Sequence, residues 1–259
     1  MKYIKYNTKD KIGYITLNRP EKRNALNAEF VEELKATFKK AEEDVNAKVI
    51  VLKAEGKAFC AGADLAYLQS LQKNSFEENL EDSKNLAELY KTIYTLNKIV
   101  IAQVEGHAIA GGAGLATVCD FVFSVPEAKY GYTEVSIGFV PAIVSFFLIR
   151  KIGETKAKEL LLTGNLISAS EAKEMTIFNF IENAGDIKKA VFDFAQDLIK
   201  NTSGDSLTLT KKLISDIQSL DYNKALNFAA EINAISRNTD DCKKGIAAFL
   251  KKEKIDWEN

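Results

Sequence analysis

The sequence predicts an α/β protein in which short strands alternate with helices and the C-terminal part is mostly helical. Short runs rich in β-branched or aromatic residues, each bounded by turn residues, predict strands at Ile12–Leu17, Val49–Leu52, Ile99–Val104 and Phe121–Val125. All three prolines and eight of the fourteen glycines lie between residues 20 and 141, whereas residues 142–259 contain five glycines and no proline. Because glycine and proline mark turns and helix ends, many short elements should come first and long helices last.

Apolar residues recur at helical spacing between these strands and again beyond residue 142. The stripes run from Phe30 to Val45, Leu86 to Ile93, Ile187 to Leu198 and Leu226 to Ile232. Strands separated by helices indicate parallel βαβ units with right-handed crossovers. We expect a core over residues 1–200 and a helical C-terminal region over residues 201–259.

Charge is balanced along most of the chain. In 259 residues, 35 Lys+Arg against 36 Asp+Glu give a net charge of −1, which argues against a basic nucleic-acid-binding surface. Two segments carry no charge: residues 106–119, with His107 neutral, and residues 135–149. Each is shorter than the roughly 18 to 20 apolar residues that span a bilayer, and each contains turn residues. They predict buried chain, and neither a membrane nor a nucleic acid is expected as a partner.

The first ten residues scatter charges and offer neither a signal-peptide nor a transit pattern, so we expect a cytoplasmic protein. The three cysteines, Cys60, Cys119 and Cys242, are widely spaced and fit a reducing compartment without disulfides or a zinc site. With a single histidine in the chain, no metal centre is expected.

Two glycine-containing turns, Gly56–Leu65 and Glu105–Leu115, each follow a predicted strand and should lead into a helix. Small side chains there let a ligand approach the backbone, and the free N–H groups of a first helical turn carry partial positive charge. Two such N–H groups aimed at one point would hold a developing oxyanion. A single glycine run more often reflects close packing of a helix on a sheet, but the pair of turns favours a site.

Four segments resemble, in order, the motifs of the enoyl-CoA hydratase/isomerase (crotonase) superfamily: Asn18–Leu26, Gly56–Leu65, Val104–Asp120 and Gly131–Pro141. The resemblance extends to the ending Gly245–Lys254. It implies a spiral of ββα turns with a helical C-terminal trimerisation region, and a homotrimer or a dimer of trimers. It also implies an acyl-CoA thioester substrate, with coenzyme A as part of the substrate and no separate cofactor.

The resemblance assigns roles to individual residues. The backbone N–H groups of Ala63 and Gly111 would form the oxyanion hole for a thioester enolate. The residues implied in CoA binding are Lys22, Arg23, Ala25, Leu26, Ala61, Asp64 and Leu65, together with Lys252, which would reach the CoA of a neighbouring subunit.

Hydratases of this superfamily commonly use two glutamates, and here only one has a counterpart. Glu134 matches the second, at the edge of an uncharged segment where desolvation should raise its pKa and suit it to acid/base work. The position of the first is Gly114, which supplies no acid, and Glu105 is a less suitable replacement. Gly114, Tyr132 and Phe139 are expected to line the acyl pocket.

Three reactions fit one carboxylate beside an oxyanion hole. We favour hydration of an enoyl-CoA by a lyase, and the segment after Ile137 resembles a bacterial methylglutaconyl-CoA hydratase-like subgroup. The carboxylate of such a substrate would fill the space left at Gly114. The alternatives are a 3-enoyl to 2-enoyl-CoA isomerase, an acyl-CoA decarboxylase and, from another class, a non-catalytic acyl-CoA-binding protein.

Other reactive side chains in these motifs have structural interpretations. His107 is expected to be packed or solvated and not a proton relay, because no nucleophile or ligand set accompanies it. Cys60 lacks an adjacent base and should be a small buried residue. Asp64 is expected to cap a helix and Asp120 to be structural, and aromatic packing is the default for Tyr130.

Overall fold

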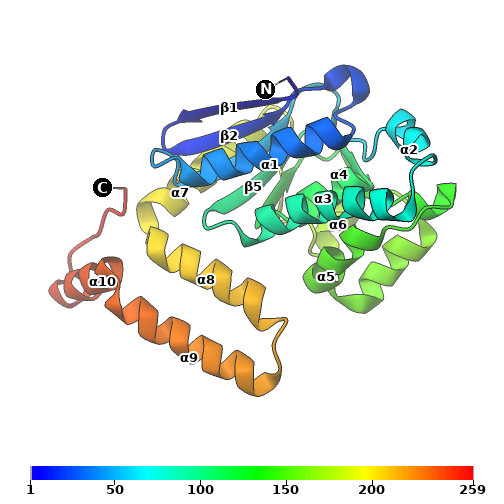
Figure 1. Ribbon diagram of the computed structural model, residues 1–259. Coiled ribbons are helices and arrows are strands. Elements are labelled where there is room, and N and C mark those ends of the chain that lie inside the picture. The colour runs from blue at the N-terminus through cyan, green and yellow to red at the C-terminus, as the bar shows by residue number, and fades with distance from the viewer. Residues whose placement is uncertain (1, 259) are drawn as a thin grey trace.

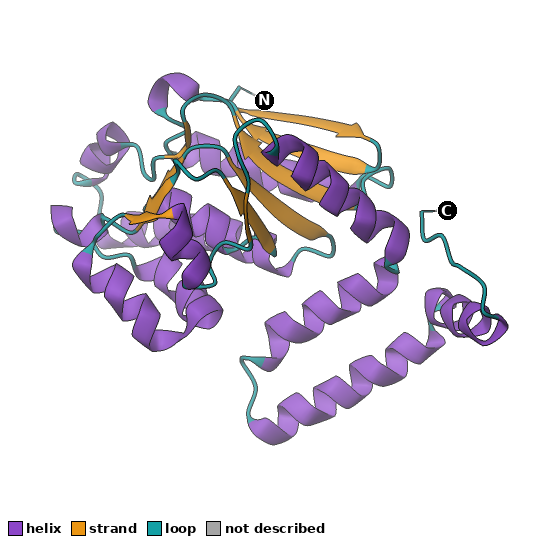
Figure 2. Ribbon diagram, turned by 180° about the vertical axis from the view of Figure 1, so that it is seen from behind, coloured by secondary structure: helices purple, strands orange, loops and turns teal. Residues whose placement is uncertain are grey.

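The computed structural model describes residues 2–258 and contains two β-sheets surrounded by helices (Figures 1 and 2). The larger sheet has the strand order β1-β2-β3-β5-β7-β10, in which only β1 runs antiparallel to its neighbour. These strands are β1 (Ile4–Lys9), β2 (Ile12–Leu17), β3 (Val49–Ala54), β5 (Ile99–Val104), β7 (Phe121–Ser124) and β10 (Phe180–Ile181). The smaller sheet has the order β4-β6-β8-β9, with strands β4 (Ala58–Cys60), β6 (His107–Ile109), β8 (Lys129–Gly131) and β9 (Ile167–Ser168).

The chain alternates between the two sheets in a repeating pattern. A strand of the larger sheet is followed by a strand of the smaller sheet and then by helix, as in β3-β4-α2, β5-β6-α4 and β7-β8-α5. The helices of this part are α1 (Ala28–Glu43), α2 (Leu65–Leu71), α3 (Phe76–Thr95), α4 (Gly111–Thr117), α5 (Ala142–Thr163), α6 (Ala169–Glu174) and α7 (Ile187–Asn201), with short 3-10 helices η1 (Pro20–Lys22) and η2 (Glu134–Ile137). The expected ββα spiral is therefore confirmed.

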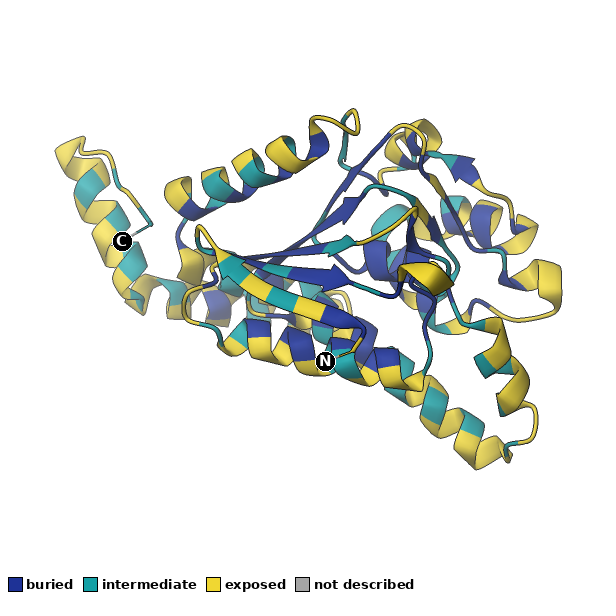
Figure 3. Ribbon diagram, turned by 90° about the horizontal axis from the view of Figure 1, so that it is seen from above, coloured by how far each residue is buried: buried dark blue, intermediate teal, exposed yellow. Residues whose placement is uncertain are grey.

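Helices cover both faces of the larger sheet. Helices α1 and α3 pack together on one face, and α7 packs against β3, β5 and β7 on the other (Figure 3). The central strands β3 and β5 are buried on both sides, which is why their sequences are continuous β-branched runs. All four predicted strands are confirmed to within two residues at each end.

Three further helices, α8 (Gly204–Ile217), α9 (Tyr222–Asn238) and α10 (Asp240–Lys251), confirm the helical C-terminal region and extend away from the sheets (Figure 1). Lys211 of α8 attaches this arm to the core, because its buried ammonium donates to Ile93 O, Lys98 O and Asp120 Oδ2. Asp120 also accepts from Val100 N–H, so its expected structural role is confirmed. Within residues 2–258, every helix falls short of the length and hydrophobicity that a membrane span requires.

The two uncharged segments differ in exposure. In residues 106–119 the expectation of buried chain holds for Ala108 and residues 112–119, whereas His107 is exposed and the other residues are partly buried. For residues 135–149 the expectation of buried chain is confirmed only in part: Val144, Phe147 and Leu148 are buried in the core, but Val135 through Val140 are exposed, and so are Phe146 and Ile149. The segment forms η2 and the first half of α5, which packs on the core through Val144, Phe147 and Leu148, while no described element covers its outer side.

Candidate active site

The two glycine-containing turns lie side by side because the strands before them are neighbours. Strands β4 and β6 pair in parallel in the smaller sheet, so the chain leaves both at the same edge. Built on the backbone, a Cβ at Gly62 would lie 3.4 Å from Gly111 N and 2.8 Å from the Ala110 Cβ. The segments that carry Ala63 and Gly111 are therefore in contact, as a shared oxyanion site requires.

The N–H of Ala63 is left free by the pairing of its neighbours. Leu26 forms a parallel bridge with Ala63, in which Leu26 N–H donates to Gly62 O and Leu26 O accepts from Asp64 N–H. In such a bridge the N–H and C=O of the middle residue point to the opposite side. Within residues 2–258 no acceptor pairs with the Ala63 N–H.

Gly111 opens α4, and its N–H is one of the first-turn donors that a helix cannot pair internally. The preceding residue, Ala110, has φ 53° and ψ −123°, a conformation that costs energy for any residue with a side chain. Two hydrogen bonds hold it there, from Ala110 N–H to Gly131 O and from Gly114 N–H to Ala110 O. The strained turn fixes the direction in which the Gly111 N–H points.

Glu134 begins η2 and is 9% exposed. Its Oε2 is buried and has no hydrogen-bond partner among the described residues. Loss of solvent raises the pKa of this carboxyl above its usual 4.5, and a bond from its own backbone N–H offsets only part of the rise. A buried carboxyl oxygen without a partner is costly, so it is a strong indication of a functional site.

The position of Gly114 is filled by its neighbours. A Cβ built there would lie 2.5 Å from Val144 Cγ1 and 3.1 Å from the Tyr90 hydroxyl. A side chain at this position would require these neighbours to move, and the expectation that a substrate carboxylate occupies this space stays a prediction. Gly114 is buried and lies behind the packed side chains of α3 and α5.

The other two residues expected in the acyl pocket lie in different surroundings. Tyr132 is fully buried, and its hydroxyl contacts Thr117 Oγ1 at 2.8 Å and the Tyr130 hydroxyl at 2.7 Å. Phe139 is 54% exposed, and its N–H donates to Glu134 O, which places it one short turn from the acid. Only Phe139 has a surface that a ligand could cover; the acyl-pocket assignment itself stays a prediction.

The segments predicted to receive CoA are joined by backbone hydrogen bonds. Ala61 N–H donates to Arg23 O, next to the bridge between Leu26 and Ala63. Lys22 and Arg23 are exposed at this turn, and Leu65 is exposed at the start of α2, whereas Ala25 and Leu26 are buried.

Asp64 has a structural role at the same place. Its carboxylate accepts from Ala66 N–H, which caps α2 as expected, and pairs at 2.9 Å with the buried guanidinium of Arg19. These partners lower the pKa of Asp64 although its burial acts in the opposite direction. Lys252 ends α10 in the C-terminal arm, far from this turn in the same chain (Figure 1).

Cys60 and His107 have no catalytic geometry. Burial raises the pKa of the Cys60 thiol to about 12, so it stays protonated. His107 is exposed, and its Nδ1 accepts from Lys129 N–H. Among the described residues no three His, Cys, Asp or Glu side chains gather as metal ligands would.

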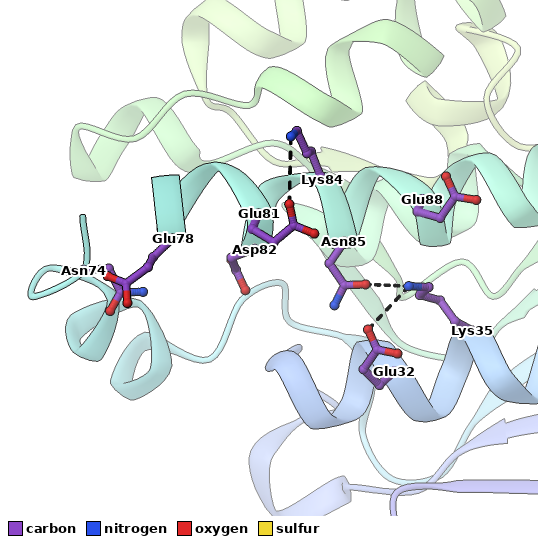
Figure 4. Close-up of a pocket in the computed structure, with 9 residues that line it drawn as sticks. All are labelled: Glu32, Lys35, Asn74, Glu78, Glu81, Asp82, Lys84, Asn85 and Glu88. Carbon is purple, nitrogen blue, oxygen red and sulfur yellow. Dashed lines mark hydrogen bonds and ion pairs between the residues drawn. The ribbon is translucent and has the colours of Figure 1, made fainter. Parts of the chain in front are cut away.

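A large surface hollow of about 720 Å³ lies between α1 and α3, away from these residues (Figure 4). It is lined by Glu32, Lys35, Asn74, Glu78, Glu81, Asp82, Lys84, Asn85 and Glu88. Five of these nine side chains are acidic, so the hollow repels phosphate groups, and it contains none of the predicted site residues.

Comparison with known proteins places this arrangement in a family. The sequence pattern of the enoyl-CoA hydratase/isomerase family matches residues 7–259. A Thermus thermophilus protein that is provisionally named an enoyl-CoA hydratase is 42% identical to this chain. The matched region covers 94% of this chain and 96% of the relative. The chain belongs to the enoyl-CoA hydratase/isomerase family. The family is one of enzymes, and the sequence resemblance is confirmed at this level.

Two further relatives support the assignment to the hydratase/isomerase family. The crotonyl-CoA hydratase of Syntrophomonas wolfei is 30% identical over 96% of this chain and 95% of its own. The crystal structure of an enoyl-CoA hydratase from Mycobacterium smegmatis superposes with a TM-score of 0.93 at 26% identity and covers all of both chains.

Sequence reasoning missed Tyr90 and Val144, which close the position of Gly114. Tyr90 lies in the apolar stripe of α3, and that pattern predicts a buried side chain but not its contact with another turn of the spiral. It also missed Arg19, which anchors Asp64 and donates to Ala25 O, although Arg19 lies inside a motif that we identified.

Proposed function

We propose that the protein is an enoyl-CoA hydratase in which Glu134 is the general acid/base and the N–H groups of Ala63 and Gly111 form the oxyanion hole. The observation that carries this proposal is the buried, unpartnered Oε2 of Glu134. A water molecule or a substrate proton would supply the missing hydrogen bond. The names of the relatives, among them a crotonyl-CoA hydratase, support the same reaction.

The reaction can be written with one carboxylate. Glu134 takes a proton from water while the water oxygen bonds to C3 of the 2-enoyl thioester. The π electrons of the C2–C3 double bond move into an enolate, whose oxygen accepts hydrogen bonds from Ala63 and Gly111. Glu134 then returns the proton to C2, which gives a 3-hydroxyacyl-CoA. No step uses a redox group, so we expect turnover without an added cofactor.

The filled position of Gly114 favours a second candidate, the 3-enoyl to 2-enoyl-CoA isomerase. A two-acid hydratase orients its water between both carboxylates, and Val144 and Tyr90 leave no place for the first. Isomerisation needs one base that removes a proton from C2 and returns it to C4, with a conjugated dienolate, whose oxygen would accept from the same N–H groups, between the steps. Glu134 alone supplies such a base.

Product analysis separates these candidates. Purified protein is incubated with crotonyl-CoA, a 3-enoyl-CoA and 3-methylglutaconyl-CoA, and the products are identified by mass: hydration adds 18 Da, roughly one water, and isomerisation adds none. We expect hydration of crotonyl-CoA. The 3-methylglutaconyl arm tests the finer substrate proposal, which now depends only on the sequence resemblance. Turnover of none of the three would contradict the enzymatic proposal and favour a non-catalytic acyl-CoA-binding protein.

A pair of variants tests the assignment to Glu134. Glu134→Gln removes the acid and should abolish most of the turnover. Glu105→Gln is the matched control, because Glu105 is the other carboxylate near the glycine turn but is bonded to Gln103 and close to Lys188. An equal loss in both variants would contradict the assignment.

We further propose that CoA binds at the turn from Lys22 to Leu26 and along Ala61 to Leu65. The exposed cations Lys22 and Arg23 would meet its phosphates, and the adjoining backbone its adenine. Isothermal titration with CoA alone tests this. The double variant Lys22→Ala/Arg23→Ala should bind it about tenfold more weakly, and Lys84→Ala, at the acidic hollow, should not.

The exposed apolar side chains support assembly into a homotrimer or a dimer of trimers. They lie on residues 135–149 and along the C-terminal arm, including Leu226, Ile235 and Phe249. Size-exclusion chromatography with light scattering gives the mass directly, and a 28.7 kDa species would contradict this proposal. Three free cysteines, which fit a reducing compartment, support a cytoplasmic location.

A further inference from the structure

Tyr90 is a buried side chain that lies at the proposed site but outside every motif. It comes from the middle of α3, is completely enclosed, and packs edge-on against Phe147 with their ring centroids 6.1 Å apart. Its hydroxyl donates to Gly111 O at 2.8 Å. The same hydroxyl would lie 3.1 Å from a Cβ at Gly111 and 3.1 Å from a Cβ at Gly114.

The hydrogen bond falls on the peptide that joins Gly111 to Gly112, next to the Ala110–Gly111 peptide that carries the Gly111 N–H. Residues 111, 112 and 114 are glycines, so the first turn of α4 lacks the side chains that restrict backbone rotation. Gly111 O is a carbonyl with two lone pairs, one of which serves the helix, and Tyr90 occupies the other. On the other side, the strained Ala110 fixes where the peptide enters the turn.

We infer that Tyr90 is a positioning residue, which aims the Gly111 N–H at the thioester oxygen and closes the place of the absent first acid. This inference rests on the proposed function, because it assumes that Gly111 binds the thioester oxygen. Tyr90 does not touch the substrate. It acts through the Gly111 carbonyl: by holding the peptide that follows Gly111 while the bonds of Ala110 hold the peptide before it, it restricts rotation about both backbone bonds of Gly111. With Val144 it also keeps the buried side of α4 free of water.

The test is Tyr90→Phe, which removes the hydroxyl and keeps the ring against Phe147. Tyr94→Phe is the matched control: Tyr94 lies one turn further along α3 and packs on the same Phe147 ring with centroids 5.3 Å apart. We expect kcat to fall about tenfold or more in Tyr90→Phe, with KM within twofold, because the oxyanion contact strengthens in the transition state. Tyr94→Phe should match the wild type in both constants.

A spectroscopic measurement separates positioning from a merely structural role. The absorbance of 2,4-hexadienoyl-CoA, a conjugated thioester, moves to longer wavelength when hydrogen bonds polarise its carbonyl. We expect this shift to fall by half or more in Tyr90→Phe and to be unchanged in Tyr94→Phe. Tyr90→3-fluorotyrosine keeps ring and donor, so it should show at least the wild-type shift; it also provides the measurement if the phenylalanine variant does not fold.

The possible outcomes are distinct. If a folded Tyr90→Phe variant keeps the wild-type kcat and the wild-type absorbance shift, the role of Tyr90 is overturned and the proposed function stands, even if the melting temperature falls. Loss of the absorbance shift in the fluorotyrosine variant overturns the role of Tyr90 in the same way. A wild-type protein that neither shifts the absorbance nor turns over substrate overturns the proposed function and this inference with it.

Discussion

The two uncharged segments both lack charged side chains but differ in exposure. Residues 106–119 run through β6 into α4, which packs against β4, β6 and α5, and they are largely buried. Residues 135–149 run from η2 into α5 and expose six large apolar side chains: Val135, Ile137, Phe139, Val140, Phe146 and Ile149. A segment without charged residues is therefore one whose contact with water is unfavourable. The group that shields it from water can be the rest of the same chain, a ligand or another copy of the chain.

Glu134 lies directly before the second segment, and two tyrosines that precede it contact the first. Thr117, near the end of the first, contacts the hydroxyls of Tyr130 and Tyr132, and the chain then enters η2 at Glu134. The acid thus lies between the buried residues 130–132 and the exposed residues 135–140. This boundary explains how a carboxyl can be desolvated and still be reached by a substrate.

The largest expected effect is at this boundary. Glu134→Gln should lower kcat by about 100-fold to 10,000-fold, because the variant has no general acid/base. It should unfold at the same urea concentration as the wild type at pH 7, or a higher one. Glu134 has a raised pKa in the fold, so its contribution to stability is fully present below the unfolded pKa near 4.5 and is lost as the pH rises through the folded value.

The pH profile gives an independent check on Glu134. If it is the base, kcat/KM of the wild type falls as the pH drops through the raised pKa, above the range of an exposed glutamate. Activity that is constant from pH 7 down to about pH 4.5 would contradict the assignment.

The next prediction compares the charged residues that follow the two uncharged segments. Asp120 follows the first segment and pairs with Lys211. Arg150 follows the second, and its guanidinium donates to the exposed Gln218 and Ser219. Lys211→Met leaves a buried carboxylate unpaired and should cost about 3–5 kcal/mol of unfolding free energy, whereas Arg150→Met should cost less than about 1 kcal/mol. If urea denaturation gave equal losses of unfolding free energy for the two variants, the proposed difference between the Asp120 and Arg150 contacts would be contradicted.

The loss in Lys211→Met should also depend on pH. Burial raises the pKa of Asp120, and the attraction of Lys211 offsets part of that rise. Without Lys211 the pKa rises further, and protonation removes the unpaired charge. The deficit relative to the wild type should therefore shrink as the pH is lowered from 7 to about 5.

A smaller effect tests the packing around the first segment. Gly114→Ala should lower the unfolding free energy by about 1–3 kcal/mol, because its Cβ would lie 2.5 Å from Val144 Cγ1. The same change in an open helix gains up to about 1 kcal/mol, and Gly204→Ala in α8, where no atom lies within 4 Å, is the control. The double variant Gly114→Ala/Val144→Ala should show coupling; simple additivity would mean that the two positions do not touch.

The sequence predicted what depends on neighbours along the chain. Strands such as Ile99–Val104 and the helical C-terminal region follow from local pattern, and Glu134 and Gly114 follow from the family motifs. Packing across the spiral could not be predicted in this way. Val144 and Tyr90 meet at Gly114 from separate helices, and no spacing rule relates them. Hydrophobic composition likewise could not show which apolar side chains of residues 135–149 lie outside the core, because it measures the cost of hydration and not the identity of the covering group.

The smallest effect asks whether a substrate covers part of the exposed segment. Phe139→Ala should raise KM about threefold to tenfold for an enoyl-CoA of eight carbons, the loss of roughly 1 kcal/mol of apolar contact, and leave crotonyl-CoA unchanged. Phe146 is equally exposed, at 54%, but lies a helical turn and more beyond Glu134, so Phe146→Ala should leave both constants as they are. If neither variant responds to chain length while both lower the mass of the assembly, the segment is covered by another copy of the chain and not by the acyl group.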